Sequence, residues 1–122
     1  MDDIDVLPPH LRAASLSDRE IVLPYREALQ AIEILQAAGW AVFAWEGWVK
    51  HPNGTHGHHG DYQGTVDLRP SPGESRADFI QRAADFCKST MLNDQLRFEE
   101  DPVRRGYTLY FCLVASPEAS EA

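Results

Sequence analysis

The sequence predicts a small α+β domain, with two helices on one face of an antiparallel or mixed sheet of three to four strands. Two segments have apolar residues at helical spacing, and three others have aromatic and β-branched residues at a spacing of two. With 122 residues, one domain can bury about two-thirds of its unfolded surface. We expect residues 16–115 to form this domain, 1–15 an N-terminal arm and 116–122 a polar C-terminal tail.

The first helix is expected over Tyr25–Ala38. Its apolar residues recur every three or four positions, Pro24 suits a helix start, and Gly39 suits a C-terminal cap. The preceding segment Glu20–Leu23 is apolar and leads into a proline, so it is either an edge strand or an extended connection.

A β-hairpin is expected next. Its arms are Trp40–Lys50 and Asp61–Arg69, joined by the glycine- and histidine-rich loop His51–Gly60. Alternation places Ala41, Phe43, Trp45, Gly47 and Val49 on one face of the first arm, and Trp40, Val42, Ala44, Glu46 and Trp48 on the other.

The second helix is expected to begin after Ser75, whose hydroxyl can cap it, and to run from Arg76 to at least Thr90. Leu96 and Phe98 favour an extension towards Asp101, where Pro102 ends it. The last strand, Tyr107–Ala115, is apolar on both faces and is therefore expected to be central in the sheet.

The predicted element order is αββαβ. If Glu20–Leu23 pairs with the sheet, the order becomes βαββαβ, the split-βαβ pattern of ferredoxin-like sandwiches. Either order leaves one face of the sheet covered by helices and the other open.

The net charge of −8 makes a nucleic-acid partner unexpected, because phosphate backbones attract basic surfaces. It favours a cationic partner instead. Cys87 and Cys112 have no CxxC neighbour, the chain opens with acidic residues, and no apolar run reaches the length of a membrane span. We expect a cytoplasmic protein with two reduced, mostly buried thiols.

The open sheet face is the main candidate site. Tryptophan and tyrosine are common binding hot spots, and carboxylates beside them would attract a basic protein. The sequence predicts a partner-binding set of Trp40, Glu46, Trp48, Asp61, Thr65, Asp67 and Tyr110, with Cys112 on the same face. Coverage of this face by other segments, or a homodimer formed through it, is the competing prediction.

The histidine-rich loop is a second candidate. His51, His56, His58, His59 and Asp61 offer imidazole and carboxylate ligands suited to zinc or nickel, and His56, His58 and His59 are the candidate metal ligands. The loop has no thiol ligand and is rich in glycine, so a solvated loop is the competing interpretation. We predict no cofactor.

An enzymatic function is not expected. Glu46 is a lone carboxylate among tryptophans, and general acid–base catalysis would need a second titrating group within reach.

Four segments of the chain resemble small α+β immunity proteins of bacterial polymorphic-toxin systems. They are the helix ending at Gly39, the Trp45–Trp48 run, the Gly57–Thr65 segment and the Leu109–Cys112 strand. The resemblance covers roughly residues 23–114. It implies membership of a class that has no shared catalytic site and whose members neutralise a cognate toxin, often a nuclease, by binding it.

The sequence therefore predicts a non-enzymatic immunity protein whose acidic, aromatic face occludes a basic toxin. The alternatives are a metal- or ligand-binding module built on the histidine-rich loop, and a structural homodimer.

Overall fold

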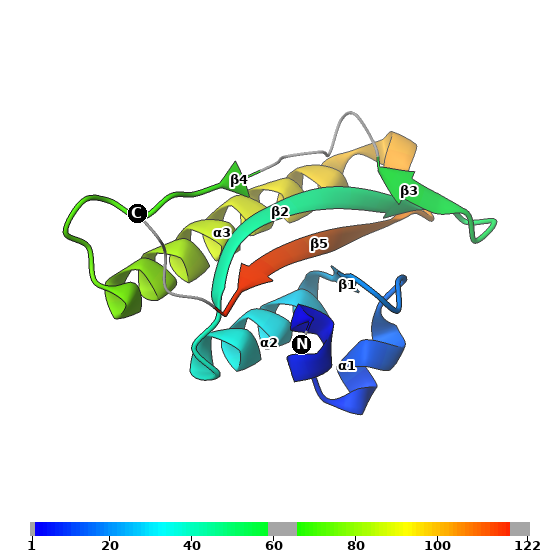
Figure 1. Cartoon of the computed structure of the whole chain (residues 1–122). Helices are drawn as coiled ribbons and strands as arrows, with labels where there is room; N and C mark the ends of the chain where they lie inside the picture. The colour runs from blue at the N-terminus through cyan, green and yellow to red at the C-terminus, as the bar shows by residue number, and fades with distance from the viewer. Residues whose placement is uncertain (1, 59–65, 118–122) are drawn as a thin grey trace.

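The computed structural model describes residues 2–58 and 66–117, which form one antiparallel sheet and its covering helices (Figure 1). The strands are β1 (Ile21–Pro24), β2 (Ala41–Lys50), β3 (His56–His58), β4 (Val66–Asp67) and β5 (Thr108–Ser116). The α-helices are α1 (Pro9–Ala14), α2 (Tyr25–Ala37) and α3 (Arg76–Glu100), with short 3-10 helices η1 (Asp3–Val6) and η3 (Pro102–Arg104). The α+β class is confirmed.

The strands follow the order β1-β5-β2-β3, and β4 pairs with the same edge of β2 nearer its start. β1 and β2 are both antiparallel to β5, so they run parallel with one strand between them. This is a split βαβ connection through α2. β1 pairs with the sheet, as the βαββαβ alternative requires, but the described order from β1 onwards is β1-α2-β2-β3-β4-α3-β5, with β3 and β4 both paired with β2. β5 is central, as its two apolar faces predict.

Helices α2 and α3 lie against one face of the sheet (Figure 1). Their buried residues join those of β1, β2 and β5 in one core cluster. At its centre the Trp45 ring is 2% exposed and packs edge-on against Phe111, with ring centroids 5.2 Å apart. The Trp45 indole N–H donates to Thr90 Oγ1 at 2.9 Å, so the largest core side chain keeps its polar group bonded.

A bulge in β2 changes the predicted alternation. Val42 pairs with Ala115 and Ala44 pairs with Val114, so Phe43 is an extra residue in the ladder. Before the bulge, Trp40 and Val42 consequently belong to the core cluster rather than to the open face. The prediction that Trp40 lies on the open face is wrong, and its ring is 8% exposed.

The N-terminal segment is part of the folded domain. Ile4, Leu7 and Leu11 lie in the main core cluster, and η1 and α1 pack beside α2 and the β1 edge (Figure 1). The expected arm over residues 1–15 therefore does not match the structure. The segment has few apolar residues, but these are enough to hold it in place because they pack into a core formed mainly by the other elements. Of the expected tail, Ser116 ends β5 and residues 118–122 lie outside the described residues.

The hairpin turn after β2 is shorter than predicted. His51 and Thr55 close it with a 2.7 Å backbone hydrogen bond, Gly54 has a φ of 94°, and His56 already begins β3. Part of the expected loop is thus a strand. The expected second arm is described only from Val66 onwards, where β4 pairs with β2.

Helix α3 takes the longer of its two expected lengths. The Ser75 hydroxyl caps its first turn by accepting from the Asp78 N–H at 3.1 Å, and Asp101 ends it. Burial of Met91 and Phe98 against the sheet outweighs the weak helix propensity of Asn93 and Asp94.

The outer edge of β1 is occupied by the segment that precedes it. The Leu16 N–H donates to the Val22 carbonyl at 3.0 Å, and the Val22 N–H donates to Ser15 Oγ at 2.9 Å. Both backbone groups of Val22 on this side of the strand are therefore satisfied within the chain.

Both cysteines are free and buried, as predicted. Burial raises the pKa of the Cys87 thiol to about 12. Within residues 2–58 and 66–117, no helix combines the length and apolar character needed to cross a membrane.

Candidate functional site

The sheet face opposite α2 and α3 carries the candidate site. β2 and β5 pair Glu46 with Cys112 and Trp48 with Tyr110, and paired residues of an antiparallel ladder share a face. The same register assigns Trp45 and Leu113 to the core face. Four of the predicted surface residues are thus brought together: Glu46, Trp48, Tyr110 and Cys112.

Two aromatic side chains form the middle of this face. Trp48 and Tyr110 lie opposite each other on neighbouring strands, and both are partly exposed. The Trp48 ring stacks on His56 of β3, with centroids 5.8 Å apart. Burial and the nearby charge of Glu27 raise the pKa of the Tyr110 hydroxyl, so it stays a neutral hydrogen-bonding group.

Carboxylates converge at the end of the face near η1. Asp3, Glu20 and Glu46 line a cavity of about 370 Å³ together with Cys112, Leu113 and Val114. The Cys112 thiol is 4% exposed and donates to Glu20 Oε2 at 3.2 Å. Burial raises the pKa of this thiol, and the Glu20 hydrogen bond and the charges of Glu20, Glu46 and Asp3 raise it further.

Asp3 lines this cavity because η1 packs beside β5. Burial raises the pKa of its carboxyl, while hydrogen bonds from the backbone of Ile4 and Ala115 act in the opposite direction. Asp3 therefore contacts β5 at Ala115, beyond the residues of β5 that pair with β1.

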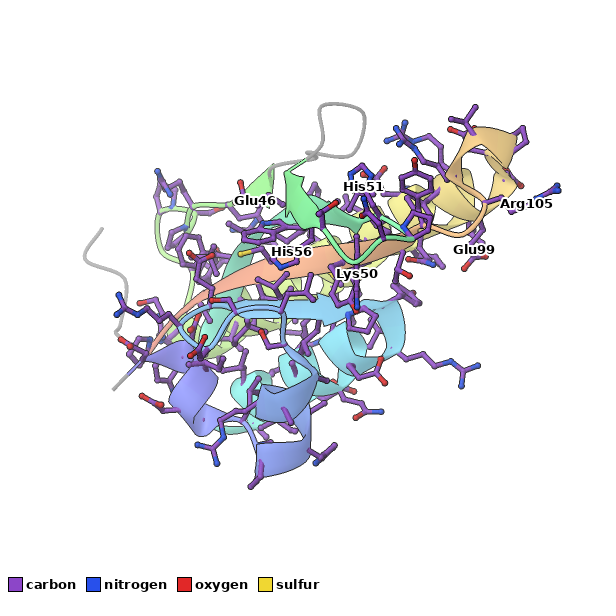
Figure 2. The ribbon with its side chains drawn as sticks, turned by 90° about the vertical axis from the view of Figure 1, so that its right-hand side faces the viewer. Glu46, Lys50, His51, His56, Glu99 and Arg105 are labelled. Carbon is purple, nitrogen blue, oxygen red and sulfur yellow. The ribbon has the colours of Figure 1, made fainter. Side chains whose placement is uncertain are left out.

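The other end of the face has a different character. Lys50, the partner of both His56 and Thr108, lies there, and Figure 2 shows Glu46 and Lys50 at separate points along the face. The face is therefore polarised along β2, with carboxylates near η1 and Lys50 near the hairpin turn. The open face does not extend onto β1, because Val22 of that strand is fully buried.

The remaining predicted residues have different outcomes. Asp67 of β4 pairs with Ala44 of β2, and this pair occupies a register position that belongs to the open face. Asp61 and Thr65 lie outside the described residues. Asp3 and Glu20 were not predicted for the site, because only the tertiary packing of η1 and the β1 edge brings them to the cavity.

Two histidines of the histidine-rich loop contact different neighbours. His51 packs on Tyr107 with ring centroids 5.0 Å apart, whereas His56 stacks on Trp48. His59 lies outside the described residues, so the predicted metal site over His56, His58 and His59 stays a prediction. In the part of the chain that the structure describes, no group of three or more His, Cys, Asp or Glu residues could hold a metal ion.

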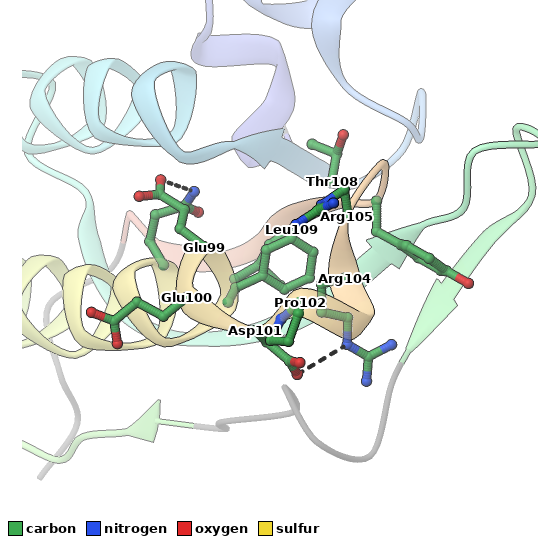
Figure 3. A pocket seen from close by; sticks show the side chains of 11 residues that line it. Glu99, Glu100, Asp101, Pro102, Arg104, Arg105, Thr108 and Leu109 are labelled. Carbon is green, nitrogen blue, oxygen red and sulfur yellow. Dashed lines mark hydrogen bonds and ion pairs between the residues drawn. The ribbon is translucent and has the colours of Figure 1, made fainter.

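A second cavity of about 370 Å³ lies where α3 ends and β5 begins (Figure 3). Gln95 donates to Glu99 at 2.7 Å, and Arg104 lies 4.0 Å from Asp101 and over the Tyr107 ring. These contacts join neighbouring residues to one another. The cavity combines carboxylates with guanidinium groups, so it lacks the single sign of charge found beside Cys112.

The chain matches no protein-family model, no curated protein and no solved structure with which it was compared.

Proposed function

We propose that this protein is a non-enzymatic, cytoplasmic protein-binding module, and specifically an immunity protein that occludes a basic toxin with its open sheet face. The observation that carries the proposal is the cross-strand register, which places the aromatic pair Trp48 and Tyr110 directly beside Glu46. Aromatic anchors flanked by charge are typical of binding hot spots. The resemblance to immunity proteins described above supports the same function.

Electrostatics supports a basic partner. The chain has a net charge of −8, and the carboxylates of Asp3, Glu20 and Glu46 gather at one end of the face. Such a field speeds the encounter with a cationic surface and is screened by salt. Trp48 and Tyr110 would then exclude water from the contact, while the carboxylates pair with Lys or Arg side chains of the toxin.

The proposal is tested with the tagged protein as bait in a lysate of the organism that encodes it, at low and then high salt. We expect one basic protein to be retained strongly at low salt, and its toxicity, which includes nuclease activity if it is a nuclease, to be lost on co-expression. Retention of only acidic or salt-insensitive proteins, or undiminished toxicity, would refute the inhibitor function.

Two variants and one control locate the interface. Trp48→Ala should weaken binding of the captured toxin by about 2 kcal/mol or more if Trp48 is an anchor. Phe86→Ala is the matched control, since Phe86 is an aromatic residue of α3 with 45% exposure. Equal effects of the two variants would remove Trp48 from the interface.

Glu46→Lys should slow association and reduce its salt dependence.

A further inference from the structure

We infer that the cavity beside Cys112 receives an arginine side chain of the partner, so that the partner is anchored by a guanidinium rather than by an ammonium group. The inference rests on the proposed function, since it names the anchoring group of the toxin.

The walls of the cavity suit a guanidinium. The exposed Val114 supplies apolar surface, and the carboxylates come from three separate segments: η1, the residue before β1, and β2. Its volume of about 370 Å³ is far larger than one water needs. A guanidinium is planar, weakly hydrated and carries five N–H donors, so one of its faces can lie on this apolar surface while its edge donates to several carboxylates.

Among the described residues that line the cavity, the charged side chains are all carboxylates. Carboxylates are the charged groups that act on the thiol of Cys112, and all three of them raise its pKa. The same described residues offer no group of three ligands for a metal ion. The field therefore favours an organic cation that reaches carboxylates spread around a cavity.

The aromatic pair next to the cavity favours arginine over lysine. Glu46 and Cys112 are followed two residues along by Trp48 and Tyr110, and alternate residues of a strand share a face. An arginine that enters across the face passes an aromatic surface before it reaches the carboxylates. Arginine stacks on aromatic rings and pairs with carboxylates through two N–H donors at once, which an ammonium group cannot do.

The test is an NMR titration of the full ¹⁵N-labelled chain with three probes: N-acetyl-arginine amide, N-acetyl-lysine amide and N-acetyl-citrulline amide, which has the shape of arginine without its charge. We expect saturable shifts at the amides of Glu46, Cys112 and Val114 with the arginine probe. Binding of the lysine probe should be weaker by on the order of tenfold, and the citrulline probe should not saturate.

Variants then assign the binding to the cavity. Glu46→Gln and Glu20→Gln should each weaken binding of the arginine probe several-fold, whereas Glu100→Gln, an exposed residue at the other cavity, should not. Val114→Arg places a guanidinium of the chain itself at the cavity and should abolish the shifts. Val114 is 41% exposed, so this variant is expected to fold.

Equal affinities for the arginine and lysine probes, or shifts confined to the residues around Glu99 and Asp101, would overturn the inference. If Trp48→Ala releases a captured toxin but the arginine probe does not bind, the inhibitor function stands and the arginine site is refuted. If the probe binds at the cavity but no basic protein is captured, the site stands and the inhibitor function is refuted.

Discussion

Two tryptophans three residues apart on β2, Trp45 and Trp48, lie on opposite faces of the sheet. Trp45 is almost fully buried, packs on Phe111 and has its indole N–H bonded to Thr90. Trp48 is partly exposed and stacks on His56. The same residue type thus completes the core on one face and is available to a partner on the other.

The difference has a physical cause in what each face contacts. On the core face, α2 and α3 supply Ala, Ile, Leu, Cys and Met side chains that exclude water around Trp45. On the open face, the neighbours of Trp48 are Tyr110, His56 and the polar residues Glu46 and Lys50. We therefore expect substitutions on the two faces to separate stability from binding.

The largest expected effect is on stability at the core face. Trp45→Ala should lower the free energy of unfolding by about 3–5 kcal/mol, because it leaves a large cavity. Trp48→Ala should lower it by only about 1 kcal/mol, since a partly exposed ring loses less buried area. Urea denaturation measures both. Similar losses would mean that the two faces are equally buried, which would remove the basis for a binding face.

A second effect tests the N-terminal segment as part of the core. Leu11 is fully buried, and Leu11→Ala should cost about 2–5 kcal/mol of unfolding free energy. Arg12→Ala changes the adjacent exposed residue of α1 and is the matched control. If both variants unfold at the same urea concentration as the unmodified chain, the segment is a dispensable arm, as the sequence alone predicted.

The hydrogen bond beneath Trp45 should have a smaller effect. Thr90→Val keeps the shape of the side chain but removes the acceptor of the indole N–H, which should cost about 1–3 kcal/mol. Thr90→Ser retains the hydroxyl and should recover most of this loss. Equal stability of the Val and Ser variants would show that packing alone holds Trp45.

The smallest effect concerns an exposed contact away from both faces. Arg82 binds both carboxylate oxygens of Glu74, at 2.8 and 2.9 Å, and holds the pKa of Glu74 at about 2, below its usual 4.5. A lowered folded-state pKa contributes stability above pH 4.5 that is lost as the pH falls through about 2. The midpoint temperature of thermal unfolding should therefore change less between pH 5 and pH 2 in Glu74→Gln than in the unmodified chain. Identical pH profiles would contradict this contribution.

Local patterns were sufficient for most of the fold. The 3.6-residue period, the Ser75 cap and Gly39 predicted both long helices, and the two apolar faces of Tyr107–Ala115 predicted a central strand. The site was predicted where alternation was unbroken, at Glu46, Trp48, Tyr110 and Cys112.

The remaining features depend on tertiary contacts. The bulge at Phe43 reverses the faces of Trp40 and Val42, and its position follows from pairing with β5 rather than from any local signal. Likewise, Asp3 and Ile4 look like solvated tail residues until η1 is placed against β5 and α2. In a strand, alternation with a period of two predicts which face of the sheet a residue lies on only as far as the first bulge.

The occupied outer edge of β1 also bears on how copies of this chain can meet. An unpaired edge strand is a template for strand addition, the first step of domain swapping and of fibril growth. Ser15 and Leu16 already take up the two Val22 backbone groups on this side. A second molecule would have to displace them before it could lengthen the sheet from β1, which protects this margin of the protein against aggregation at high concentration.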